Sequence, residues 1–156
     1  MSHERLANDR PFAADDPALY PGWHLLDFLI SLGADEFSLD FLYAGQEKEE
    51  CSRLSGKLAF ASLGKKMREC TSTYQGRTNP REIEVWRLDQ RALEVLRELL
   101  PKGVLSSINW ERAGAEDLCV YRDGELVFGT VTHEHYAFLR ISDSEWKRWQ
   151  ERREEI

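Results

Sequence analysis

Apolar and polar residues recur along this chain with two different periods, which distinguish its helices from its strands. Leu25 and Leu29 belong to a set of leucines at helical spacing, and they predict a helix over 21–32 that ends before Gly33. In 36–43, by contrast, every second residue is apolar, which predicts a strand with one buried face.

The second half of the chain contains the clearest hairpin signal. Asp123 and Gly124 lie between two alternating apolar runs, as expected for a two-residue turn in which glycine accepts a positive φ. With the apolar run that follows, this hairpin predicts a three-stranded antiparallel meander over about 117–141. Ser142 and Glu145 have the spacing of a capping box and predict the start of a final helix.

The middle of the chain is less regular. We expect a strand over 81–89, a helix over 89–100 and a strand over 104–110. The segment 46–81 is ambiguous: a helix before Gly56, a short strand slightly favoured over a helix in 57–63, and a loop over 71–81.

These elements predict an α+β fold, because helices do not alternate regularly with strands as they do in parallel α/β proteins. The expected architecture is a mainly antiparallel sheet that includes the C-terminal meander, with about three helices packed on it. Residues 1–18 are polar and contain two prolines, so we expect a flexible or surface-draped arm there. Residues 19–156 are expected to form a single domain.

Charge is distributed unevenly along the chain, whose net charge is −7. Residues 1–50 carry 11 acidic and 3 basic side chains, whereas residues 51–100 carry 6 acidic and 10 basic ones. We expect no nucleic-acid binding from an acidic protein, since that affinity comes mainly from neutralised phosphates. The absence of a leader pattern or a long apolar run predicts a cytoplasmic protein without membrane contact, and three well-separated cysteines predict free thiols. We expect no cofactor.

The densest group of chemically active side chains is His133, Glu134 and His135. Two histidines separated by one residue point the same way on a strand and could bind zinc, or one of them could act as a general base. Both interpretations are weighed against a polar turn. A continuous strand from Glu125 to Ile141 would span about 56 Å at about 3.3 Å per residue, more than the width of about 40 Å expected for this domain. The sequence therefore predicts a turn at the histidines and neither a metal site nor a catalytic residue.

Two further groups are candidate binding sites. Lys65, Lys66, Arg68, Arg77 and Arg81 lie near glycines and could bind an anion, although the P-loop pattern is absent and a solvated basic face is favoured. Trp146 and Trp149 share one face of the final helix. We favour docking of this face onto the sheet over a partner surface, and we expect Trp23, Trp86 and Trp110 in the core.

Two hypotheses about function follow. The first is a non-catalytic binding or regulatory protein with a protein partner, for example a small acidic bacterial accessory protein that neutralises a basic partner. Toxin-immunity proteins act in this way, but the analogy is one of size and charge and not a family match. The alternative is a hydrolase-like enzyme in which His133 or His135 is the acid–base group of a site assembled from distant residues. The sequence predicts neither the partner nor the oligomeric state.

Overall fold

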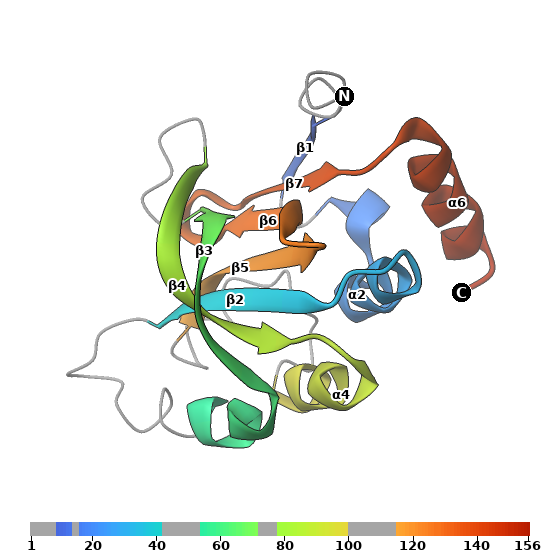
Figure 1. Cartoon of the computed structure of the whole chain (residues 1–156). Helices are drawn as coiled ribbons and strands as arrows, with labels where there is room; N and C mark the ends of the chain where they lie inside the picture. The colour runs from blue at the N-terminus through green and yellow to red at the C-terminus, as the bar shows by residue number, and fades with distance from the viewer. Residues whose placement is uncertain (1–8, 14–15, 42–53, 72–77, 100–114) are drawn as a thin grey trace.

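The chain folds around one seven-stranded antiparallel sheet with helices on one of its faces (Figure 1). The computed structural model describes residues 9–13, 16–41, 54–71, 78–99 and 115–156. The strand order is β1-β7-β6-β5-β2-β4-β3. The strands are β1 (Asp9–Ala13), β2 (Glu36–Phe41), β3 (Ser62–Cys70), β4 (Asn79–Arg87), β5 (Ala115–Arg122), β6 (Glu125–Val131) and β7 (Tyr136–Arg140). The α-helices with determined bounds are α2 (Gly22–Ser31), α4 (Gln90–Leu99) and α6 (Asp143–Glu154).

The α+β class and the C-terminal meander are confirmed. Strands β5, β6 and β7 pair in order, and the turn between the first two is at Asp123 and Gly124, which both have positive φ. Helix α6 begins with the predicted capping box: the Ser142 hydroxyl accepts a hydrogen bond from the backbone amide of Glu145, whose carboxylate accepts one from the amide of Ser142. These signals are local, so the sequence predicts them well.

The first helix is confirmed, and so is the strand after it as far as Phe41, but not its single buried face, because Glu36 and Ser38 are buried as well. Helix α2 buries its leucines, and Gly33 follows its end with a φ of 101°, a backbone conformation that glycine adopts without a steric penalty. Strand β2 buries Phe37 against Trp86 of β4, with ring centroids 5.7 Å apart.

Two expectations in the middle of the chain are wrong. Most of the segment 57–63 does not form a strand: residues 54–58 are helical, a 3-10 turn follows at Ala59–Ala61, and β3 begins only at Ser62. Strand β4 begins at Asn79, inside the expected loop. The apolar residues Leu58 and Ala61 are three positions apart, as on one face of a helix, and both are buried. This helical spacing determines the local structure more strongly than the glycines on either side do. The strand expected over 104–110, with Trp110, lies outside the described residues.

The expected N-terminal arm contributes an edge strand to the sheet. Residues 9–13 pair with β7, and Pro11 is compatible with this position because an edge strand need not donate every backbone hydrogen bond. A 3-10 turn at Pro17–Leu19 then buries Leu19 in the main core. The described part of the expected arm therefore belongs to the sheet.

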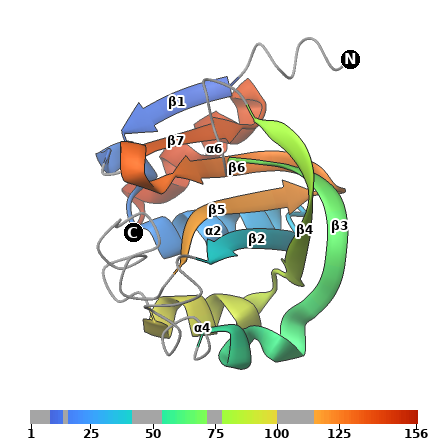
Figure 2. The ribbon, with the colours of Figure 1, turned by 90° about the vertical axis from the view of Figure 1, so that its left-hand side faces the viewer.

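The long strands β3 and β4 curve across the face of the sheet that the helices do not cover (Figure 2). The Thr71 hydroxyl donates a hydrogen bond to the carbonyl oxygen of Thr130 on β6 at 2.6 Å, and the Tyr121 hydroxyl donates one to the carbonyl oxygen of Glu69 at 2.6 Å. This approach depends on Gly129, because a Cβ atom there would lie 2.7 Å from Phe138 and 3.1 Å from the Thr71 methyl group.

The curvature creates two hydrophobic cores. The larger one lies between the sheet and the helices and includes Trp149 of α6, which is fully buried. The smaller one lies under the curved strands. Its buried residues are Cys70, Cys119, Tyr121, Leu126 and Phe138.

Candidate functional site

The segment with two histidines forms the predicted turn. Strand β6 ends at Val131, a 3-10 turn covers Thr132–Glu134, and β7 begins at Tyr136. His135 has φ 53° and ψ 43°, a left-handed conformation that reverses the chain direction. The two histidines therefore do not belong to one continuous strand, as the length argument predicts. Glu134 and His135 are exposed, whereas the side chain of His133 lies outside the described part of the chain.

The expected anion-binding segment is mostly strand. Lys66 Nζ lies 2.8 Å and Arg68 Nε 3.0 Å from the carboxylate oxygens of Glu36 on β2. The Glu36 side chain is only 10% exposed. Burial alone would raise the pKa of Glu36, but the hydrogen bonds from Lys66 and Arg68 outweigh it and lower the pKa. The guanidinium of Arg68 also lies over Gly124 in the β5–β6 turn. Both cations thus neutralise a carboxylate of the acidic N-terminal part.

Two other cations of that segment are described. Lys65 and Arg81 are exposed on β3 and β4, opposite Glu84 and Arg68 respectively. Arg77 lies outside the described residues. The role of the segment in anion binding remains a prediction.

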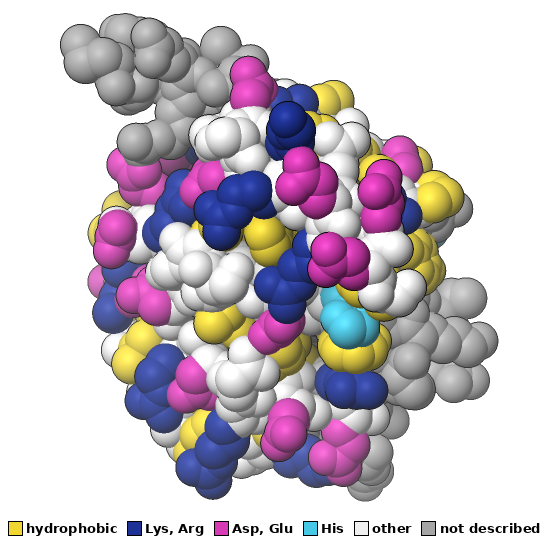
Figure 3. Space-filling model, turned by 90° about the vertical axis from the view of Figure 1, so that its right-hand side faces the viewer, with side chains coloured by type: hydrophobic (Ala, Val, Ile, Leu, Met, Phe, Trp, Pro, Cys, Tyr) yellow, Lys and Arg dark blue, Asp and Glu magenta, His cyan; other side chains and the backbone are white. Residues whose placement is uncertain are grey.

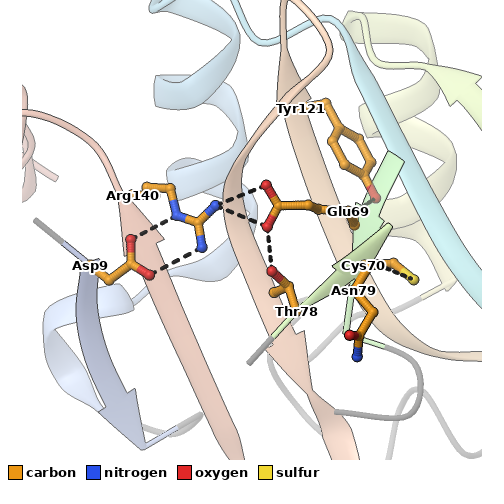
Figure 4. Close-up of polar contacts among 7 residues, drawn as sticks. All are labelled: Asp9, Glu69, Cys70, Thr78, Asn79, Tyr121 and Arg140. Carbon is orange, nitrogen blue, oxygen red and sulfur yellow. Dashed lines mark hydrogen bonds and ion pairs between the residues drawn. The ribbon is translucent and has the colours of Figure 1, made fainter. Parts of the chain in front are cut away.

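A polar cluster around Arg140 joins three separate parts of the chain (Figure 4). The guanidinium binds Asp9 on β1 at 2.7 Å and Glu69 on β3 at 3.3 Å, while the Thr78 hydroxyl donates to Glu69 as well. The Arg140 side chain is 8% exposed, and the hydrogen bonds and charges of the two carboxylates keep its pKa raised in spite of burial. The cluster fastens β1 and the end of β3 to β7, which is a structural role.

The two tryptophans of α6 both face the rest of the domain. Trp149 is buried beside Phe28, and its indole Nε1 donates a hydrogen bond to the carbonyl oxygen of Ala18 at 2.8 Å. Trp146 is half-buried against Phe12 of β1, with ring centroids 5.3 Å apart. These contacts are those of helix docking, the alternative that the sequence favours.

Three carboxylates come together where β2 and β5 pair. Single oxygen atoms of Asp40, Glu116 and Asp117 lie within 4.8 Å of one another, and oxygen ligands of this kind suit hard divalent cations such as Ca²⁺ or Mg²⁺. Asp117 has a φ of 56°, and its carboxylate accepts a hydrogen bond from the backbone amide of Thr132 at 3.0 Å. Asp117 therefore already has a structural function, closing the β5–β6 pair.

The two thiols within the described residues, Cys70 and Cys119, are buried. Burial raises the pKa of Cys119 to about 11, although its hydrogen bond with Thr71 opposes this shift. A thiol in this state is not a nucleophile near neutral pH, because the thiolate is the reactive species.

A pocket of about 470 Å³ opens between α2 and α4. It is lined by Trp23 in the first turn of α2 and by Glu94, Arg97 and Glu98 of α4. Because residues three and four apart share one helix face, the three α4 side chains form one wall. Trp23 is half-buried at the margin of the main core, and the three charged residues are exposed.

The pocket already contains a stacked cation. The guanidinium carbon of Arg97 lies 3.7 Å from the centroid of the Trp23 ring, which is a close cation–π contact. The His24 ring contacts the same indole, with centroids 3.6 Å apart. Burial lowers the pKa of His24, and the charges of Arg152 and Arg97 lower it further against the opposite effect of Asp27. A neutral imidazole adds no positive charge to the pocket.

Acidic side chains outnumber basic ones in the lining of the pocket, although Lys57 beside it offsets part of their charge. Two carboxylates and one guanidinium line it, so the lining carries a net charge of −1. Glu98 also forms an exposed ion pair with Lys57 at 3.3 Å. Figure 3 shows that acidic and basic side chains intermingle over this helical side of the molecule. Binding of a charged ligand on this side would depend on the positions of individual side chains, because no electrostatic potential of one sign extends over it.

The sequence predicts Trp23 in the core and a helix over 89–100, with no site on either. This prediction misses the pocket because the packing of α2 against α4 is a tertiary relationship that neither helix encodes alone. The available signal is that Glu94, Arg97 and Glu98 share a face, which becomes informative only when an aromatic residue is known to lie opposite.

Comparison with protein-family models, with curated proteins and with solved structures finds no match. Within the described residues, no helix is both long enough and apolar enough to cross a membrane. The function must therefore be inferred from the chemistry of the sites themselves.

Proposed function

We propose that this protein binds a basic protein partner and carries out no chemistry of its own. The observation that carries the proposal is the Trp23 pocket, in which a half-buried indole lies beside the carboxylates of Glu94 and Glu98. Tryptophan is over-represented among residues that dominate binding energy, and a carboxylate beside an aromatic face suits a cationic side chain. The net charge of −7 favours the approach of a basic partner over long distances.

An accessory role of the immunity-protein kind is consistent with this proposal. Such a protein needs a rigid surface and not a reactive group, and the pocket is built on two helices that pack on the same core. A cytoplasmic location, where thiols are kept reduced, is part of this proposal.

The proposal is tested with the full chain and three fluorescein-labelled probes: hexaarginine, hexaglutamate and a six-nucleotide oligothymidylate. We expect fluorescence anisotropy to show saturable binding of hexaarginine, weaker at 150 mM than at 20 mM salt, and no comparable binding of the two anionic probes. The variant Glu94→Gln/Glu98→Gln should weaken hexaarginine binding. The matched control Glu82→Gln, which removes an exposed carboxylate from β4, should have a much smaller effect. Preference for either anionic probe would contradict the proposal.

A further inference from the structure

The contact between Arg97 and Trp23 has a feature that ordinary surface ion pairs lack. The Arg97 side chain is exposed, yet its guanidinium lies on the indole face at 3.7 Å, beside two carboxylates of the same helix. The cation thus occupies the position at which the pocket offers most to a cationic ligand: an aromatic face and nearby negative charge.

We propose that Arg97 is an internal occupant of this pocket and that an arginine side chain of the partner displaces it. This inference rests on the proposed function and names the chemical group that the Trp23 pocket receives. Arg97 shows the geometry in which a guanidinium fits here. An incoming arginine can stack on the same indole and use its planar donors on Glu94 or Glu98.

The displacement costs little because Arg97 is held weakly. An exposed cation–π contact contributes on the order of 0.5–1 kcal/mol, and a long exposed side chain gains rotational freedom when it is released. The chain thereby protects the indole face when no partner is bound, and the partner must compete for it. The same geometry predicts a preference for arginine over lysine, since an ammonium group is compact and more strongly hydrated.

Removing Arg97 should strengthen the binding of a cationic ligand. Arg97→Gln removes the competing cation and changes the lining charge from −1 to −2, so it should tighten hexaarginine binding about two- to five-fold. A pocket for an anion would lose its one lining cation and bind hexaglutamate less well. The matched control is Arg91→Gln, which removes an equally exposed cation from the same helix, where it stacks on Phe60 at 3.9 Å.

The experiment measures dissociation constants by anisotropy for hexaarginine and hexalysine with the wild type, Arg97→Gln, Arg91→Gln and Trp23→Leu. Support requires that Arg97→Gln binds hexaarginine tighter than both the wild type and Arg91→Gln, and that the gain is smaller for hexalysine. Equal effects of the two arginine variants would overturn the inference, because they would show a general charge effect. Unchanged or weaker binding by Arg97→Gln would overturn it as well.

A direct readout keeps the inference testable if Trp23→Leu fails to fold. In an NMR titration with arginine amide, the indole Nε1 resonance of Trp23 should shift in the wild type and shift at lower ligand concentration in Arg97→Gln. If hexaarginine binds but this resonance does not respond, the inference fails while the proposed function survives with another site. If no cationic probe binds the wild type or Arg97→Gln, the proposed function itself fails.

Discussion

Arg140 of β7 holds the carboxylate of Asp9 with two nitrogen atoms, Nε at 2.7 Å from Oδ1 and Nη2 at 3.1 Å from Oδ2. This two-point contact joins residues 131 positions apart and fastens the edge strand β1 to the domain. The same guanidinium reaches Glu69 of β3, so one side chain connects both ends of the strand order to β7.

Replacing this side chain should destabilise the protein. We expect Arg140→Gln to lower the free energy of unfolding by about 1–3 kcal/mol, less than the 3–5 kcal/mol typical of a broken buried ion pair, because Asp9 and Glu69 are partly exposed and can be hydrated. Urea denaturation measures the change. Lys57→Gln removes a cation from an exposed ion pair and should change stability by no more than about 0.5 kcal/mol. Equal losses would show that the Arg140 cluster contributes no more than a surface pair.

Two glycines should respond to alanine in opposite directions. Gly129→Ala places a Cβ atom 2.7 Å from Phe138, on the face where β3 covers β6, and should cost about 1–3 kcal/mol. Gly56→Ala adds a methyl group with nothing within 4 Å in a helical segment, and should stabilise by about 0.4–1 kcal/mol. Midpoints of thermal unfolding report both changes. A stable Gly129→Ala would mean that the Phe138 ring and the Thr71 methyl group can move away at little cost.

Acid should weaken the fold partly through Glu36. The pKa of Glu36 is lower in the folded protein, so its contribution is present above the unfolded value of about 4.5 and is lost as pH falls through the folded value. The stability difference between the wild type and Glu36→Gln should therefore be largest near neutral pH and shrink below pH 4.5. Urea titrations from pH 7 to pH 3 measure it. Glu82→Gln, on the exposed face of β4, should differ little from the wild type throughout. A Glu36→Gln difference that grows toward acid pH would contradict the assignment.

The accuracy of the sequence predictions follows the range of the interactions that determine each element. The hairpin at Asp123 and Gly124 and the cap at Ser142 depend on neighbours within a few residues, and both are as expected. The strand β1 has only five residues, and its extended conformation depends on backbone pairing with β7. The sequence of β1 is too short for a periodic pattern to predict a strand. The helix over residues 54–58 continues past Gly56, where the sequence predicts its end, because a helix tolerates a glycine at a modest cost in stability.

The candidate sites follow the same rule. The histidine turn was predictable because strand length limits the chain locally. The Glu36 cluster, the carboxylate group at Asp40 and the Trp23 pocket each join residues from distant segments, and no spacing in the sequence reports such a meeting.

The histidine turn offers a final test in which only the backbone differs. His135 has φ 53°, a conformation in which a Cβ atom costs roughly 1–2 kcal/mol and glycine costs little beyond its greater freedom in the unfolded chain. His135→Gly and His135→Ala both remove the imidazole, so we expect the glycine variant to be more stable by about 1 kcal/mol. The matched pair Glu134→Gly and Glu134→Ala lies one residue earlier, in the 3-10 turn, and should show the opposite order because alanine is favoured there. Free energies of unfolding of the four variants decide the matter. If alanine equals glycine at position 135, the left-handed conformation of this residue does not limit the stability of the turn.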